Sequence, residues 1–188
     1  MRIVGGQFRG RALVAPSHDG TRPTSDRVRE AIFNILAHGV PDFALSGARV
    51  LDLFAGTGAL GLEALSRGAA HCLFVEEDAE ARALIRRNVE ALGLTGVTKI
   101  FRRDATALGP AGRASGFSLV FLDPPYGKGL AEKALASAAG DGWLATGSVA
   151  VIEERKGVTV ELPAGFEMLD QRAWGDTQAV FVRFTAAA

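Results

Sequence analysis

The segment that most limits the possible folds is the apolar run at residues 50–54 together with the glycines that follow it. A near-continuous apolar run of this length is typical of a parallel strand that is buried on both faces. The next residues, Gly56-Thr57-Gly58-Ala59-Leu60-Gly61, have the spacing G-x-G-x-x-G and open a helical pattern. Such glycines permit a tight turn and leave the N–H groups of a helix start open to a ligand. The segment predicts a ligand-binding strand, loop and helix within an α/β fold.

The same alternation of strand and helix patterns continues along the chain. Strands are expected at 72–75, 97–101, 117–122 and 149–152, with helices at 60–66, 79–92 and 129–139. Residues 166–174 and 179–184 are joined by Gly175-Asp176-Thr177-Gln178 and predict a closing antiparallel hairpin. The expected fold is an α/β, mostly parallel seven-stranded sheet with an antiparallel C-terminal hairpin and helices on both faces.

Residues 1–45 precede this alternation and form an expected N-terminal extension, while residues 46–188 form the main domain. Residues 2–4 and 8–14 are short β-prone runs, and the glycine-rich turn between them predicts a small hairpin. A helix is expected next, with Thr24 as a plausible N-cap, and Gly39 and Pro41 are expected to end it.

Positive charge gathers in the first 29 residues, although the whole chain has 21 basic and 21 acidic residues and a formal charge of zero. Two aspartates in this stretch, Asp19 and Asp26, stand against six arginines, namely Arg2, Arg9, Arg11, Arg22, Arg27 and Arg29. Any contact with a polyanion is therefore expected at the N-terminal end. A solvated helix face is the plainer interpretation of the same arginines.

The composition excludes several other classes of protein. No apolar run approaches the roughly 20 residues that span a bilayer, and no sustained apolar segment follows Met1, so neither a membrane span nor a signal peptide is expected. The only cysteine, Cys72, lies in an apolar run, where burial is expected. The three histidines have no ligand spacing, so no metal site is expected. We expect a cytoplasmic monomer.

Acidic residues follow several of the expected strands, where ligands bind in doubly wound sheets. Glu76 comes 20 residues after Gly56, at a position where an acid can accept both hydroxyls of a ribose. Its neighbours Glu77 and Asp78 leave open which of the three acids does so. Asp104-Ala105 follows the third strand and can reach the amino group of an adenine.

Two cofactor classes use this geometry, and Asp52 helps to separate them. A carboxylate just before the glycine loop is awkward beside the pyrophosphate of a nicotinamide dinucleotide. S-adenosylmethionine has no phosphate and carries positive charge, so Asp52 could serve it directly or through water. Each of these acids also has a plainer interpretation, as a polar residue at the end of a strand.

The tetrapeptide Asp123-Pro124-Pro125-Tyr126 ends the fourth strand and combines groups that suit an amine on a flat ring. The Asp123 carboxylate and the Pro124 carbonyl accept hydrogen bonds, and the Tyr126 ring offers a face for stacking. A proline-rich turn that merely ends the strand is the alternative.

These motifs carry a resemblance. The stretch from Asp52 to Gly61, taken with Asp123-Pro124-Pro125-Tyr126, resembles the class I S-adenosylmethionine-dependent methyltransferases that act on exocyclic amines. Three further segments resemble the RsmD-type ribosomal RNA guanine-N2 methyltransferases of the small subunit: Gly10-Arg11, residues 22–30 and residues 61–68. The resemblance covers nearly the whole chain, and residues 22–30 are its most specific part.

The resemblance implies a Rossmann-like class I methyltransferase fold and methylation of one guanine N2 in 16S rRNA, within the small ribosomal subunit. It implies S-adenosylmethionine as cofactor, S-adenosylhomocysteine as product and no metal. The residues implied in cofactor binding are Asp52, Phe54, Ala55, Gly56, Thr57, Gly58, Glu76, Asp104 and Ala105. The arginines that are candidates for RNA phosphate contacts are Arg9, Arg11, Arg22 and Arg27.

The expected mechanism is direct methyl transfer to a base that has left its stack. Tyr126 stacks on the base, while Asp123 and the Pro124 carbonyl accept hydrogen bonds from the amine. With an ordinary pKa of about 4, Asp123 would orient the amine without deprotonating it beforehand, and the proton would leave after transfer.

Three other functions remain open at this point. Methylation of adenine N6 in DNA uses the same tetrapeptide, but the chain has no obvious second domain to read DNA. A nicotinamide dehydrogenase would need a well-placed acid/base residue such as histidine, and none follows a strand suitably. An RNA-binding module without catalysis would not need the acids at the strand ends.

Overall fold

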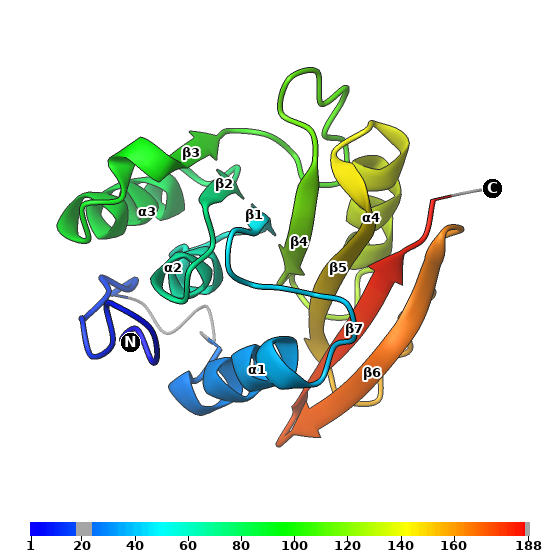
Figure 1. Cartoon of the computed structure of the whole chain (residues 1–188), viewed down its shortest axis with the longest axis horizontal. Coiled ribbons are helices and arrows are strands. Elements are labelled where there is room, and N and C mark those ends of the chain that lie inside the picture. Colours follow the sequence, from blue (N-terminus) through cyan, green and yellow to red (C-terminus); the bar gives the residue numbers. More distant parts are fainter. Residues whose placement is uncertain (18–23, 187–188) are drawn as a thin grey trace.

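One seven-stranded sheet organises the protein, whose computed structural model describes residues 1–17 and 24–186 (Figure 1). Its strands are β1 (Arg49–Leu53), β2 (His71–Val75), β3 (Thr98–Phe101), β4 (Phe117–Leu122), β5 (Leu144–Arg155), β6 (Phe166–Trp174) and β7 (Thr177–Phe184). Their order across the sheet is β3-β2-β1-β4-β5-β7-β6. Strands β1 to β5 pair in parallel, and β7 runs antiparallel between β5 and β6. The predicted mixed sheet with an antiparallel C-terminal hairpin is confirmed.

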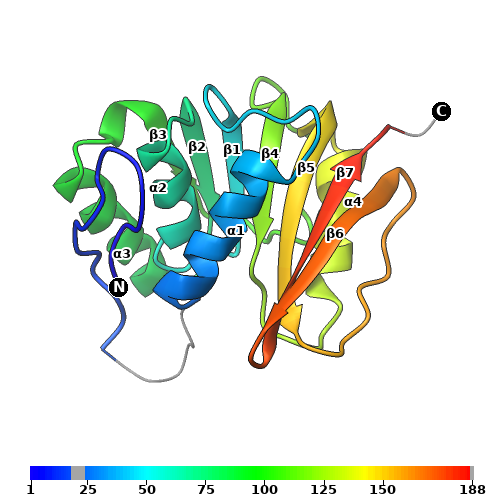
Figure 2. The ribbon, with the colours of Figure 1, turned by 60° about the horizontal axis from the view of Figure 1, so that its bottom comes forward.

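Helices cover both faces of this sheet, as predicted (Figure 2). The α-helices are α1 (Asp26–His38), α2 (Ala59–Ser66), α3 (Ala79–Ala91) and α4 (Leu130–Gly140), with a 3-10 turn, η1 (Thr95–Val97), before β3. Apolar side chains of α1, α2 and α3 pack into one core, and those of α4 pack into a second core on the opposite face. No helix in the described parts of the chain is long and apolar enough to cross a membrane.

Most element boundaries differ from the sequence prediction by one or two residues, but two differences matter. Strand β5 runs from Leu144 to Arg155, well beyond the apolar core at 149–152, because its ends pair with β4 and β7. The N-cap of α1 is Ser25, whose Oγ accepts a hydrogen bond from the N–H of Val28 at 3.2 Å. The predicted cap, Thr24, was wrong because its hydroxyl binds Glu153 on β5.

The N-terminal hairpin is present in a reduced form. Its two segments pair through a single antiparallel bridge between Arg2 and Ala12. Regular strands do not extend further because the turn docks on the end of α2 instead. There the N–H of Gln7 donates to the carbonyl of Ser66, and the N–H of Phe8 donates to the Ser66 hydroxyl.

Glu63, on α2, anchors this N-terminal segment from inside the protein. Its carboxylate accepts hydrogen bonds from the N–H groups of Val4 at 2.9 Å and Gly5 at 2.8 Å. It also pairs with Arg29 of α1 at 3.4 Å, and both side chains are fully buried. Arg29 therefore links α1 to α2. The expectation that Arg29 is a surface arginine was wrong, because its side chain is buried.

Asn88, on α3, connects the N-terminal segment to the glycine loop. Its side chain accepts from the N–H of Val14 and donates to the carbonyl of Val14, which fixes that residue from both sides. The same amide also donates to the carbonyl of Thr57 at 3.1 Å. The buried Asn88 side chain thus connects Val14 in the N-terminal segment to Thr57 in the loop after β1.

Candidate active site

The glycine loop leaves β1 through three residues in the left-handed region. Phe54 has a φ of 58°, which is unusual for a residue with a side chain, and Gly56 and Gly58 have φ values of 57° and 80°. The N–H of Gly58 closes the turn on the carbonyl of Ala55 at 2.8 Å. A Cβ on Gly56 would meet no atom within 4 Å, so the backbone there is open to a ligand.

Gly61, the last glycine of the motif, has a packing role. A Cβ at this position would lie 2.5 Å from the Cys72 sulfur and 2.5 Å from the ring of Phe74, both on β2. Only a residue without a side chain lets α2 approach the sheet this closely.

Asp52 lies beneath the glycine loop and is almost completely buried. Its Oδ2 accepts a hydrogen bond from the N–H of Gly61 at 3.0 Å, so it fixes the first turn of α2. Burial raises the pKa of Asp52 well above its ordinary value, and the hydrogen bond from Gly61 only partly opposes this. Asp52 therefore supports the loop from within the protein, and its role toward a cofactor remains a prediction.

Glu76 lies nearest to the loop among the three acids that follow β2. Its Oε2 accepts a hydrogen bond from the N–H of Gly56 at 2.8 Å, and its Oε1 accepts one from the N–H of Asp78. The side chain of Asp78 caps α3 through the N–H of Ala81 at 2.8 Å. Asp78 caps α3, whereas Glu76 contacts the glycine loop, so Glu76 is the better candidate to bind a ribose.

Asp104 and Ala105 follow β3 at the same edge of the sheet. The Asp104 carboxylate is exposed and accepts hydrogen bonds from the hydroxyl and the N–H of Thr106, and these bonds lower its pKa. Ala105 is buried in the same core as the end of β2. The two residues form an edge beside the loop where a flat ring could lie.

Asp123 and Glu153 occupy matching positions on neighbouring strands. The parallel register pairs Leu122 with Ile152, so the next residue on each strand is an acid. Side chains alternate along a strand, so both acids lie on the same face of the sheet as Phe121 and Val151. Helix α1 covers this face. The hydroxyl of Thr24 donates to Glu153 and lies 2.8 Å from each carboxylate oxygen.

The pKa of Asp123 differs from the ordinary value that the sequence led us to expect. Burial raises it to about 7, and the nearby Glu154 charge adds to this while a hydrogen bond with Thr24 opposes it. The expectation of a pKa near 4 was wrong because it ignored the loss of water at the strand end. A carboxylate with this pKa can take a proton from a reacting group near neutral pH.

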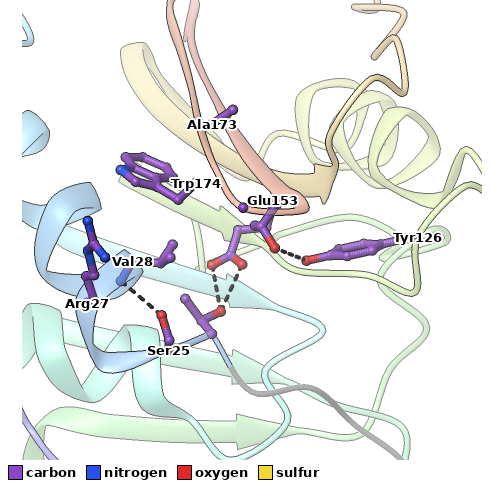
Figure 3. Close-up of a pocket in the computed structure, with 10 residues that line it drawn as sticks. Ser25, Arg27, Val28, Tyr126, Glu153, Ala173 and Trp174 are labelled. Carbon is purple, nitrogen blue, oxygen red and sulfur yellow. Dashed lines mark hydrogen bonds between the residues drawn. The ribbon is translucent and has the colours of Figure 1, made fainter.

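A cavity of about 420 Å³ opens beside these acids (Figure 3). It lies between the start of α1, the tetrapeptide and the β6–β7 hairpin, and Figure 3 shows Glu153 between Tyr126 and Trp174. The Tyr126 hydroxyl lies 3.4 Å from that of Thr177. The lining residues are Thr24, Ser25, Arg27, Val28, Tyr126, Glu153, Ala173, Trp174, Gly175 and Thr177.

Only Arg27 and Tyr126 among these lining residues were predicted as site residues, and the other eight were not. The rule that selected Asp123, an acid directly after a buried strand, applies equally to Glu153 and could have found it. No comparable signal exists for Trp174 and Thr177, because their place depends on how the C-terminal hairpin folds back over β5.

The candidate RNA-binding arginines differ in exposure and in the contacts that their side chains make. Arg27 lines the cavity, and Arg9 is exposed on the N-terminal segment. The guanidinium of Arg11 donates to the carbonyl of Ala91 at the end of α3, at 2.8 Å. Arg22 lies outside the described residues.

Sequence comparisons find relatives over most of this chain. The sequence profile of the family "Conserved hypothetical protein 95" matches residues 1–183. Ribosomal RNA small subunit methyltransferase D of Escherichia coli K12 is 40% identical over 81% of this chain and 74% of its own length. Its Haemophilus influenzae counterpart is 32% identical over 93% of this chain and 89% of its own length.

Solved structures agree in fold. Escherichia coli yhhF superposes with a TM-score of 0.82 at 34% identity and covers 100% of this chain and 99% of its own. The Thermus thermophilus 16S rRNA N2 G1207 methyltransferase, solved with AdoMet and guanosine, has a TM-score of 0.62 at 24% identity. It covers 89% of this chain and 44% of its own, and at that identity its likeness shows the fold alone.

The sheet order and these structural neighbours show the fold of class I methyltransferases. Within that class, the chain belongs to the family called Conserved hypothetical protein 95, the RsmD-type methyltransferases.

Proposed function

We propose that the protein transfers a methyl group from S-adenosylmethionine to the N2 amine of one guanine in 16S rRNA of the small ribosomal subunit. The observation that carries this proposal is the cavity lined by Tyr126 and Glu153, which offers a ring-sized space where β4 and β5 end. The names of the family's curated relatives support an rRNA substrate.

The residues around the glycine loop fit the proposed cofactor. The open backbone at Gly56 leaves space for its amino acid part, and Glu76 lies where ribose hydroxyls can donate to it. Asp104 and Ala105 would flank the adenine. Phe54, Ala55, Thr57 and Gly58 shape the loop, and Asp52 holds it from below. S-adenosylmethionine supplies an electrophilic methyl group when it is bound.

Asp123, Pro124 and Tyr126 would prepare the amine for attack. Tyr126 packs on the base, a contact worth about 1–3 kcal/mol. Asp123 and the Pro124 carbonyl accept the two N–H hydrogens, so the nitrogen lone pair turns out of the ring plane toward the methyl carbon. The nitrogen becomes cationic as the new N–C bond forms and the C–S bond breaks. It then loses a proton, which the Asp123 carboxylate can accept.

The raised pKa of Asp123 predicts an acid limb in the pH profile. Because only the ionised carboxylate accepts both a hydrogen bond and a proton, kcat/KM should rise with pH and level off above about pH 7. At pH 6 activity should be about tenfold below the plateau. Assays between about pH 5.5 and 8.5 at constant ionic strength would test this, with S-adenosylhomocysteine binding as the control. A flat profile across neutral pH would contradict the role given to Asp123.

The exposed arginines predict a salt-dependent contact with RNA. Replacing Arg9 and Arg27 together by glutamine should weaken RNA binding and reduce the slope of log K against log salt by about 0.7–0.9 for each phosphate that is no longer neutralised. Arg183→Gln is a suitable control, since Arg183 lies on β7 and donates to the carbonyl of Pro41. Equal slopes for the control and the double variant would show that RNA binds elsewhere.

Labelled S-adenosylmethionine tests the function directly. The protein would be incubated with small subunits, naked rRNA and DNA, and each product digested and identified by mass spectrometry. N2-methylguanosine from small subunits is the expected product. N6-methyladenosine from DNA would instead establish the alternative, which uses the same tetrapeptide.

A further inference from the structure

Glu153 is a buried acid inside the cavity that the proposed mechanism does not use. It is only 2% exposed, yet it lines the cavity with Tyr126 and Trp174. Burying a carboxyl group is costly unless its polar atoms find partners. Thr24 is the one side chain that donates a hydrogen bond to Glu153 among the described residues. The remaining hydrogen-bonding capacity of this carboxyl is therefore available to a ligand.

The position of Glu153 relative to Asp123 limits what such a ligand can be. The two acids stand on adjacent parallel strands at matching register, with their side chains on the same face of the sheet. Neighbouring strands lie about 4.8 Å apart, so the two carboxyl groups can contact adjacent polar atoms of one flat ring. If Asp123 holds an exocyclic amine, Glu153 faces the ring atoms next to that amine.

Those neighbouring atoms differ between the two candidate bases. Beside its N2 amine, guanine carries the N1–H donor and then the O6 acceptor. Beside its N6 amine, adenine carries the N1 acceptor and then a C–H group. A carboxylic acid has one acceptor and one donor, so it can pair with guanine N1–H and O6 together, whereas adenine offers it only one partner.

We propose that Glu153 selects guanine by pairing with its N1–H and O6 atoms, while Thr24 fixes the orientation of the Glu153 carboxyl group. This inference rests on the proposed function, because it assumes that the base enters with its amine on Asp123. It adds a specificity residue from β5 to the groups that hold the amine.

The electrostatic surroundings of Glu153 agree with this pairing. Burial, and then the charge of Asp123, raises the pKa of Glu153 well above its ordinary value, although the hydrogen bond from Thr24 and the charge of Arg29 oppose this. Burial and the Asp123 charge both favour the neutral acid, since two neighbouring carboxylates in a buried site resist full ionisation. Thr24 donates to one oxygen and leaves an O–H available for guanine O6.

Two substitutions separate pairing from charge. Glu153→Gln keeps one acceptor and one donor, so methyl transfer to small subunits should stay within about threefold of the native protein. Glu153→Ala removes both and should lower kcat/KM by about ten- to a hundredfold, which is the discrimination expected of a two-bond contact with a base. Glu80→Ala, which removes an exposed acid from α3, is the control and should have no effect. Equal losses in Glu153→Gln and Glu153→Ala, or no loss in either, would overturn the proposal.

Nucleoside competitors test the same contact without relying on how a variant folds. Guanosine and 2-aminopurine riboside share the amine for Asp123, but 2-aminopurine lacks both N1–H and O6. With the native protein, guanosine should inhibit methyl transfer at least about tenfold more strongly than 2-aminopurine riboside. In Glu153→Ala this preference should disappear, and in Glu153→Gln it should persist. If guanosine competes no better than 2-aminopurine riboside with the native protein, the proposal is wrong.

Failure of this inference can be told apart from failure of the proposed function. A native protein that forms N2-methylguanosine without preferring guanosine over 2-aminopurine riboside retains its function and loses only the role of Glu153. A native protein that forms no N2-methylguanosine from any RNA overturns both. Thermal unfolding of each variant shows whether the substitution has changed stability instead of recognition.

Discussion

Asp123→Ala is expected to lower methyl transfer by at least about a thousandfold, because it removes the acceptor that we propose holds the amine and takes its proton. Asp123 follows β4, and its side chain lies on the α1-covered face beside Glu153. Of the nearby buried acids, Asp52 is bound to the loop, Glu154 accepts hydrogen bonds from the N–H groups of Gly127 and Arg155, and we propose that Glu153 pairs with other atoms of the base. None of the three can replace the missing group without moving a strand.

Cofactor binding distinguishes this result from a general loss of structure. The affinity for S-adenosylhomocysteine, measured by calorimetry, should stay nearly unchanged in Asp123→Ala, since the glycine loop and Glu76 are intact. A parallel loss of affinity and activity would mean that Asp123 belongs to the cofactor site.

The stability of Asp123→Ala provides a second check. The folded-state pKa of about 7 lies above the ordinary value of 3.8, so the folded protein binds a proton more tightly than the unfolded chain does. The contribution of Asp123 to stability is full below that ordinary value and is lost as the pH rises through 7. At pH 8 the carboxylate is a half-buried charge that opposes folding. Asp123→Ala should therefore melt no lower than the native protein at pH 8.

Glu63→Ala is expected to destabilise the protein by about 3–5 kcal/mol, because it leaves the Arg29 guanidinium buried without its partner on α2. The same change removes the acceptor for the N–H groups of Val4 and Gly5, which hold the N-terminal segment on α2. For a chain of this length the melting temperature should fall by roughly 10 °C. Denaturant unfolding followed by circular dichroism measures the loss.

Asp170→Ala is the matched control, because it breaks an ion pair on the surface of β6. Its partner Arg172 lies 3.1 Å away, and the two side chains are 30% and 59% exposed. Exposed pairs contribute about 0–1 kcal/mol, so this variant should unfold close to the native protein. Similar losses from both substitutions would show that burial of the Glu63 pair is not what stabilises the fold.

Much of the fold could be predicted from the sequence because its strongest signals are local. A strand buried on both faces, such as β4, appears as an unbroken apolar run, and its bounds at Phe117–Leu122 match the prediction. Strand β5 was predicted too short because its polar ends, from Leu144 onward, are ordered by pairing with β4 and β7. Pairing between strands that are distant in the sequence cannot be predicted from a local residue pattern.

The candidate site could be located from the sequence to the extent that its residues follow strands, while the roles of those residues remain predictions. Asp123, Glu76 and the glycine loop could be read from single motifs. The positions of Thr24 and Arg29 could not be predicted in this way. A hydroxyl near a helix start suggests an N-cap, and a guanidinium there suggests a surface charge. Their true partners, Glu153 and Glu63, are 129 and 34 residues away in the sequence, and only the folded structure brings them together.

The interior position of β7 has a consequence for how the chain acquires its structure. This strand follows every other strand in the sequence, yet it lies between β5 and β6, and its central residues are completely buried. Within the described part of the chain, β6 has β7 as its only neighbour in the sheet, so it cannot dock until β7 has been inserted. The cavity needs Trp174 and Thr177 from this hairpin as well as residues 24–28. Contacts between such distant segments form slowly, so we expect this cavity to be among the last parts of the molecule to assemble.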